Sequence, residues 1–306
     1  MKQLVAIERL AAARPEVVRE IARVEDLPIH AFSFGTAASD APVLLVVGGV
    51  HGIERIGTEV AIAFLSALVA RLAWDAVLHD ALARCRIVVV PLLNPVGMAR
   101  GQRANGNGVD LMRNAPAHAL GGTPFLGGQQ LSPRLPWFMG KRGAPMQTEA
   151  AALVALVDHE LRGSPFSIAV DLHSGYGFID RLWYPYARSR EPVPDRPGID
   201  ALGRLLDDTL PNHVYRLEQT AQAYTIRGDL WDYLYDRVPR GTLLPLTLEM
   251  GSWAWVRKNP LQGLTTLGRF NPVVAHRLRR TLRRHLPLLE FLHHAAASHR
   301  AWMPTS

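Results

Sequence analysis

His51 and Glu54 lie three residues apart in the segment VVGGVHGIERIG, which begins at Val46. Two glycines interrupt an apolar run just before them, so a tight turn at the end of a buried strand can bring both side chains to one point. Two histidines and one glutamate form a common ligand set of catalytic zinc, with water in the fourth position. The motif H-x-x-E also arises by chance, so a metal site requires a third ligand elsewhere.

Two other apolar runs end in residues that suit such a site. His173 ends the run in AVDLHSGYG; alone it would be a hydrogen-bonded structural histidine, whereas beside His51 and Glu54 it completes three ligands. Glu249 ends the run in PLTLEMGSW, where burial of a carboxylate without a partner is unfavourable. Unless it faces solvent or pairs with an arginine, Glu249 is positioned to act as the general base toward a metal-activated water.

Three charged residues cluster around the segment NGVDLMRN. Asp110 could accept the second ring N–H of a liganding histidine and so fix its tautomer. Arg103 and Arg113 flank this aspartate, and guanidinium groups stabilise an oxyanion or bind a substrate carboxylate through paired hydrogen bonds. Taken singly, each arginine is better explained as a solvated surface charge.

The surrounding pattern predicts how these residues are positioned. Near-continuous apolar runs indicate strands buried on both faces, and helix-period segments alternate with them. The strand runs begin at Pro42, Arg86, Ser167 and Leu243. The helical segments are Thr58–Ala73, Thr148–Arg162, Ile199–Leu210, Asp229–Tyr235 and Asn271–Ala297. This alternation predicts an α/β fold with the site at the carboxyl ends of the strands, and a Gly- and Pro-rich loop, Ala115–Pro145, beside it.

The bulk properties narrow the function classes. The 306 residues predict a single domain, 1–306, and the single cysteine, Cys85, excludes an intrachain disulfide and a Cys-based zinc site. No signal peptide or membrane-length apolar run is found, so we expect a cytoplasmic protein without a membrane partner. The oligomeric state cannot be derived from the sequence.

The net charge of +7 raises the possibility of an acidic partner. The most basic stretch, HRLRRTLRRHLPLLEFLHH from His276, has leucines at 278, 282, 286 and 289. This spacing predicts a helix with one face on the core and its arginines in water, rather than a nucleic-acid or membrane surface. We therefore expect no nucleic-acid partner.

The ordered motifs resemble those of the zinc carboxypeptidases of the carboxypeptidase A/B type. The matching segments are HGIE at His51, NPVGMARGQRANGNGVDLMRN from Asn94, DLHSGYG at Asp171, YTIRGDLWDYLY at Tyr224 and TLEMGSW at Thr247. The resemblance implies a mixed, mainly eight-stranded sheet between helices. It also implies that His51, Glu54 and His173 bind one Zn²⁺ per chain, although other divalent ions suit such ligands.

The same resemblance implies roles for the remaining residues. Glu249 would activate water and pass the proton to the leaving amine, and Arg103 would stabilise the oxyanion. Arg113 would bind the substrate's terminal carboxylate, and Asp110 would orient a liganding histidine. Tyr224 would be the mobile tyrosine that closes over substrate.

The sequence departs from the family pattern near the expected carboxylate site. Met112 replaces an asparagine that assists the carboxylate-binding arginine, and a thioether donates no hydrogen bond. Ile53 stands where many members have an arginine before the glutamate, and Gly175 replaces a frequent tyrosine. Trp231 occupies the position that helps to set side-chain preference, where a large ring shortens the pocket.

Three functions remain open at this stage. The first is a metallocarboxypeptidase-like hydrolase of an amide bond next to a carboxylate-bearing residue. The second is a deacylase of small N-acyl amino acids, like the related aspartoacylases and succinylglutamate desuccinylases, which also use H-x-x-E. The third is a non-catalytic metal-binding regulatory protein, although such a protein does not need the base Glu249.

Overall fold

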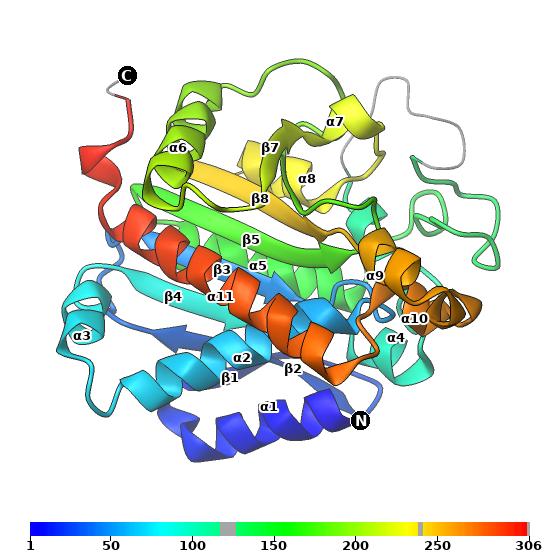
Figure 1. Cartoon of the computed structure of the whole chain (residues 1–306). Coiled ribbons are helices and arrows are strands. Elements are labelled where there is room, and N and C mark those ends of the chain that lie inside the picture. The colour runs from blue at the N-terminus through cyan, green and yellow to red at the C-terminus, as the bar shows by residue number, and fades with distance from the viewer. Residues whose placement is uncertain (117–126, 238–240, 305–306) are drawn as a thin grey trace.

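The structure is a computed structural model that describes residues 1–116, 127–237 and 241–304. An eight-stranded sheet crosses the centre of the molecule in the order β1-β2-β4-β3-β5-β8-β6-β7 (Figure 1). Its strands are β1 Val18–Val24, β2 Leu27–Phe34, β3 Val43–Gly48, β4 Arg86–Val90, β5 Phe166–Ser174, β6 Arg181–Tyr184, β7 Arg216–Gln219 and β8 Thr242–Met250.

Helices surround this sheet. The α-helices are α1 Lys2–Ala13, α2 Arg55–Arg71, α3 Ala76–Leu82, α4 Pro95–Arg100, α5 Thr148–Leu161, α6 Arg196–Thr209, α7 Thr220–Ala223, α8 Leu230–Arg237, α9 Trp253–Lys258, α10 Thr266–Phe270 and α11 Ala275–Ala297. Short 3₁₀ helices are η1 Pro15–Val17, η2 Leu111–Arg113, η3 Pro260–Leu264 and η4 His299–Ala301.

The sheet is mixed. The central strands β4, β3, β5 and β8 are parallel to one another, while β1, β2 and β6 join through antiparallel pairs and β7 lies parallel to β6. The expected mixed eight-stranded α/β fold is therefore confirmed. Because the four central strands point the same way, their carboxyl ends lie at one edge of the sheet, where open α/β sheets place their ligands.

Each face of the sheet has its own hydrophobic core. In β3, Leu44 and Val46 pack into one core with Phe64 of α2 and Leu288 of α11, while the alternate residues face the other core. That second core is covered by α5 and α8. The alternation explains why the central strands are apolar at nearly every position: both of their faces are buried.

Gly49, directly after β3, makes the turn that the sequence predicts. Gly49 has a φ of +67°, and a Cβ there would lie 2.5 Å from Oγ1 of Thr58 and 2.6 Å from Cδ1 of Leu92. A side chain at this position would therefore be both strained and obstructed. The tight turn brings the following residues, His51 to Glu54, back over the end of the sheet.

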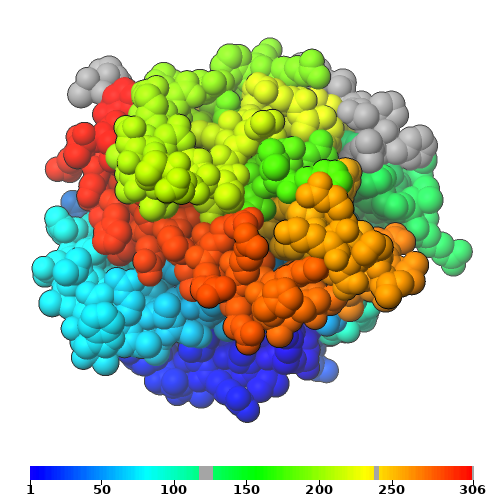
Figure 2. Space-filling model, viewed as in Figure 1, coloured from blue at the N-terminus to red at the C-terminus, as the bar shows by residue number. Residues whose placement is uncertain are grey.

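The C-terminal helix α11 lies across one face of the molecule, between its blue–cyan and its green–yellow parts (Figure 2). Leu289 is fully buried, and Leu278, Leu282 and Leu286 pack partly buried against the core, as the spacing predicts. Among the described residues no single helix is long and apolar enough to cross a membrane. α2 and α3 pass that test only together, and they are bent by 111°.

Candidate metal centre

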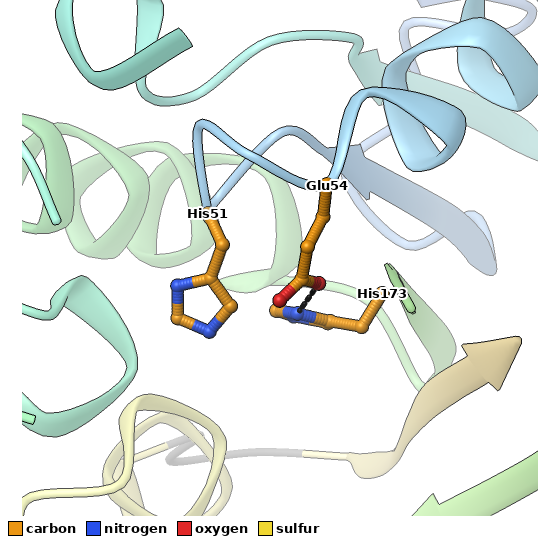
Figure 3. A group of neighbouring side chains, drawn as sticks. All are labelled: His51, Glu54 and His173. Atoms are coloured by element: carbon orange, nitrogen blue, oxygen red, sulfur yellow. Dashed lines mark hydrogen bonds and ion pairs between the residues drawn. The ribbon is translucent and has the colours of Figure 1, made fainter. Parts of the chain in front are cut away.

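His51, Glu54 and His173 meet at the carboxyl-terminal edge of the sheet (Figure 3). His51 and Glu54 come from the turn between β3 and α2, and His173 lies near the end of β5. One potential ligand atom from each residue lies within 4.8 Å of the others, and all three side chains are buried. A buried His–Glu–His set of this kind suits a zinc ion. The donor types and their spacing therefore fit the metal that the sequence implies.

The turn that carries Glu54 is fixed by a residue far away in the sequence. The side-chain amide of Asn271, between α10 and α11, donates to the carbonyl oxygen of Ile53 at 2.7 Å. Its Oδ1 accepts the N–H of Ile56 at 2.9 Å. Because the first N–H groups of a helix have no partner within the helix, Asn271 satisfies one of them and holds the start of α2 in place.

His173 lies between two carboxylates. Its Nδ1 is 3.1 Å from Oε2 of Glu54, and its Nε2 is 2.8 Å from Oδ2 of Asp171. Asp171 also accepts the indole N–H of Trp231 at 2.8 Å. Such a carboxylate behind a histidine fixes the ring and its tautomer for metal binding. Trp231, expected only as a pocket wall, therefore also holds the carboxylate that orients a predicted ligand.

Asp110 connects both arginines of the predicted site. Its Oδ2 accepts Nε of Arg103 and Nη1 of Arg113, both at 3.0 Å, and its Oδ1 lies 3.7 Å from Nδ1 of His51. Burial opposes ionisation of this carboxyl, but the two guanidiniums prevail and hold its pKa below the usual range. Arg103 additionally donates to Oε1 of Glu54 at 2.9 Å and lies 2.7 Å from Nε2 of His51.

The local charges favour a cation among the three predicted ligands. Burial, reinforced by Arg103, lowers the pKa of His51 to about 3, so its imidazole is neutral, and its Nε2 lone pair faces the Arg103 guanidinium. Burial also opposes protonation of His173, but Asp171 and Glu54 outweigh it and raise its pKa well above the ordinary value. A positive charge, whether a proton or a metal ion, is thus stabilised between these carboxylates.

Glu249 lies directly beside His173. The two residues are partners in the parallel register of β5 and β8, so their side chains project to the same side of the sheet. Burial, followed by the charge of Glu54, raises the pKa of Glu249 to about 8. Its Oε2 is buried and has no hydrogen-bond partner among the described residues. A carboxylate in this setting is a stronger base than one in water.

Tyr224 stands between two cavities. Its ring centroid lies 6.1 Å from that of Tyr176 and 5.9 Å from that of Trp183, and its hydroxyl pKa is raised to about 12, mainly by burial. Tyr224, Arg103 and Glu249 line both cavities. Met112 and Arg113 also line one of them, which we call the inner cavity; the other is called the outer cavity.

The positions at which the sequence departs from the family pattern are divided between the two cavities. Met112 is a wall of the inner cavity, whereas Ile53 and Gly175 line the outer one. Arg55 does not replace the missing arginine, because it lines a separate hollow beside α1 and donates to the carbonyl oxygen of Met98 at 3.5 Å.

The structure thus brings together all the predicted ligands, the predicted base and the charged residues around them, while their catalytic roles stay predictions. The sequence reasoning did not identify Asp171 or Asn271. Asp171 had a signal, because residues i and i+2 of a strand share a face and it therefore lies on the same side as His173. Asn271 had none, because no local pattern indicates a contact across more than two hundred residues. Part of the predicted loop Ala115–Pro145 lies outside the described residues.

Known structures share this fold. A thrombin-activatable fibrinolysis inhibitor superposes with a TM-score of 0.71 at 17% identity, over 95% of this chain and 72% of that one. Carboxypeptidase A from Helicoverpa armigera gives a TM-score of 0.68 at 18% identity, over 95% and 71% of the two chains. At these identities the likeness concerns the fold.

Sequence comparison points the same way. Human carboxypeptidase A1 is 24% identical over 65% of this chain and 48% of its own length. Carboxypeptidase SOL1 of Arabidopsis thaliana is 25% identical over 72% and 42%. The chain thus spans about half the length of the curated relatives it matches. The sequence model of the zinc carboxypeptidases matches residues 4–254, which include every predicted ligand and Glu249. The chain belongs to the zinc carboxypeptidase family.

Proposed function

We propose that this protein is a zinc-dependent hydrolase that cleaves an amide bond next to a carboxylate-bearing residue. The observation that carries the proposal is the pairing of Glu249 with His173 across β5 and β8, beside the His51–Glu54 turn. A site that only stored or sensed a metal ion has no need of a buried, basic carboxylate next to its ligands. Membership of the zinc carboxypeptidase family supports the same reaction class.

The proposed chemistry divides between the metal and the chain. A bound zinc ion supplies Lewis acidity and a water whose pKa is lowered to about 7. Glu249 holds the proton that this water gives up, because its raised pKa of about 8 makes it a suitable acceptor near neutral pH. The same carboxyl then passes the proton to the leaving amine.

The two arginines have separate proposed tasks. Arg103 borders both cavities, so its guanidinium can donate to the oxygen that becomes negative when the carbonyl is attacked. Arg113 lies deeper, is 2% exposed and lines only the inner cavity, where it can bind the substrate carboxylate. The side chain of Tyr224, which lies between the two cavities, covers the bound substrate.

The test is an activity screen of the zinc-loaded full chain on blocked dipeptides and N-acyl amino acids. Each assay is run with chelator, with zinc restored, and with Glu249→Gln. The amide of the Gln variant keeps the shape of the side chain but accepts no proton. We expect its turnover to fall by about 10²–10⁴-fold while zinc affinity, measured by competition titration, stays close to that of the parent.

Two results would contradict the proposal. Near-parental turnover of Glu249→Gln on a verified substrate removes the base assignment. Stoichiometric zinc binding without hydrolysis of any probe points instead to a metal-binding protein that does not catalyse.

A further inference from the structure

The inner and outer cavities meet at the predicted reaction centre. Arg103, Tyr224 and Glu249 line both. The predicted ligands are divided between them: His51 and His173 face the inner cavity, and Glu54 faces the outer one. A substrate whose scissile bond lies where the two cavities meet therefore extends into both of them. The size of each cavity limits the size of the substrate group that it can hold.

The inner cavity is small. Its volume is about 30 Å³, a small fraction of the volume of the outer cavity. A carboxylate alone accounts for three heavy atoms, and Arg113 is present to bind it. The thioether of Met112 and the rings of Trp183 and Trp231 line this cavity, so a substrate side chain would have to share its small volume with the carboxylate.

The walls of the inner cavity are also fixed. The indole N–H of Trp231 donates to Asp171 at 2.8 Å, and that of Trp183 donates to Oε1 of Glu218 at 3.0 Å. Both tryptophans are 2% exposed. Swinging either ring aside would break a hydrogen bond to a carboxylate and disturb a packed core, so the cavity does not readily deepen.

The outer cavity is much larger and mainly apolar. Its volume is about 570 Å³, within the range of pockets that enclose drug-sized molecules. Apolar residues from three separate segments line it: Ile53, Pro133, Leu135, Pro136, Trp137 and Phe270. The arginine that many relatives carry before the predicted glutamate ligand is absent here, and buried Ile53 stands in its place.

The loop that walls the outer cavity has a defined internal structure. The buried side chain of Gln129 donates to the carbonyl oxygens of Ser132 and Leu135, and its Oε1 accepts the N–H of Leu131 at 2.6 Å. Trp137, whose carbonyl oxygen accepts the backbone N–H of Gln129 at 2.9 Å, has a φ of +59°, a backbone conformation that bulky residues rarely adopt. Strained residues of this kind persist where the surrounding structure fixes them, and they concentrate at binding sites.

We propose that the site selects N-acylglycine units, with a glycine-sized carboxylate in the inner cavity and a bulky apolar or aromatic acyl group in the outer one. This inference rests on the proposed hydrolase function. Water adds its oxygen to the acyl carbon, the C–N bond breaks, and the glycine nitrogen receives the proton held by Glu249. The acyl group can be that of a free N-acylglycine or the hydrophobic penultimate residue of a peptide ending in glycine.

The experiment measures kcat/KM of the zinc-loaded full chain on two matched series. In the first, benzyloxycarbonyl-phenylalanine is followed by glycine, alanine, leucine or phenylalanine. We expect kcat/KM to fall by at least about 100-fold from the glycine to the phenylalanine member, because each added group must enter a filled cavity. In the second, glycine carries an acetyl, a benzoyl or a benzyloxycarbonyl-phenylalanyl group, and kcat/KM should rise by at least about tenfold along the series. The benzoyl and the peptidyl members distinguish the two sources of the acyl group.

Substitutions in each cavity test the amine-side and the acyl-side preference separately. Met112→Ala enlarges the inner cavity and should raise the leucine-to-glycine ratio without changing acyl preference. Trp137→Ala removes an outer wall and should reduce the benzoyl-to-acetyl ratio without changing amine-side preference. Leu135→Ala serves the same purpose if the tryptophan variant is unstable. Leu131→Ala is the matched control, because Leu131 belongs to the same loop, is 75% exposed and does not line the cavity.

The outcomes distinguish this inference from the proposed function. Hydrolysis of the phenylalanine member as fast as the glycine member overturns the inference and leaves the hydrolase intact. If no probe is cleaved, the hydrolase proposal fails, and the Kd of each uncleaved probe is measured by calorimetry on the zinc-loaded chain. The same order of affinities then supports the selectivity, whereas equal affinities overturn it.

Discussion

Two pairs of buried histidines in this protein have opposite surroundings. His51 and His173 lie at the edge of the sheet among the carboxylates of Asp110, Glu54 and Asp171. His285 and His293 lie on α11 and pack into the core, where burial lowers the pKa of each to about 4. Burial of a histidine is thus common to both pairs and does not mark a site.

The difference lies in the charge around each ring. Asp180 is the nearest carboxylate to His285, with its Oδ2 3.8 Å from Nε2, but that oxygen also accepts Nη1 of Arg284 at 2.9 Å. No ion pair of His293 is found among the described residues. Carboxylates at both ring nitrogens of His173 favour a cation there, whereas burial without such a pair of carboxylates favours the neutral imidazole of His285 and His293. The comparison predicts which pair binds a metal ion and which responds to acid.

Replacing one histidine of each pair should give the largest difference in zinc affinity. His51→Ala removes one of three predicted ligands, so zinc affinity should fall by more than the roughly 10–100-fold that loss of a supporting residue produces. His293→Leu removes an equally buried histidine and should leave zinc affinity unchanged. Competition titration with a chromophoric chelator measures both. Equal losses in the two variants would mean that the zinc site has been misplaced.

The carboxylate behind His173 should have an intermediate effect. Asp171→Asn keeps the size of the side chain but removes its charge, and we expect zinc affinity to fall by about 10–100-fold. Trp231→Phe removes the N–H donor and part of the ring but keeps the Asp171 charge, so it should weaken zinc binding by less than Asp171→Asn. The same titration ranks the two variants. The reverse order would show that Trp231, not Asp171, determines the position of His173.

The pair on α11 should have the smallest effect, and only in acid. The pKa of His293 is about 4 in the folded protein and about 6.5 when unfolded, so the unfolded chain binds the proton more readily between these values. Its contribution to stability is complete above pH 6.5 and is lost as the pH falls toward 4. Each pKa unit corresponds to about 1.4 kcal/mol, which gives roughly 2 kcal/mol at pH 4.5.

Urea unfolding of the parent and of His293→Leu at pH 7 and pH 4.5 measures this effect. The variant should lose less free energy of unfolding on acidification than the parent. An identical loss in both proteins would show that His293 titrates normally in the folded state.

Sequence patterns predicted the central strands because these strands are buried on both faces. The apolar runs correspond to β3, β4, β5 and β8, and the long periodic segments correspond to α2, α5, α6, α8 and α11. The outer strands β1 and β2 were not predicted. In β1 the alternation is imperfect, with exposed Arg19 and Glu20 side by side, and its pairing with β2 contains a register irregularity.

The candidate site was predictable to the extent that strand ends converge. His173 and Glu249 each end an apolar run, and the parallel register of the two strands places them side by side. The cavities could not be predicted, because their shapes depend on contacts between distant segments. Trp231 illustrates this: its place on α8 follows from the periodic pattern, but its hydrogen bond to Asp171 depends on how α8 packs against β5.

The side-chain amide of Asn271 determines how far a functional fragment of this protein must extend. The match to the family ends at residue 254, before this residue, although it contains all the predicted ligands. A fragment cut there would keep each of those side chains and yet leave the Ile53–Ile56 turn untethered. Boundaries for expressing or transplanting this site must therefore be drawn beyond Asn271, because the ligand-bearing segment alone lacks the residue that fixes its geometry.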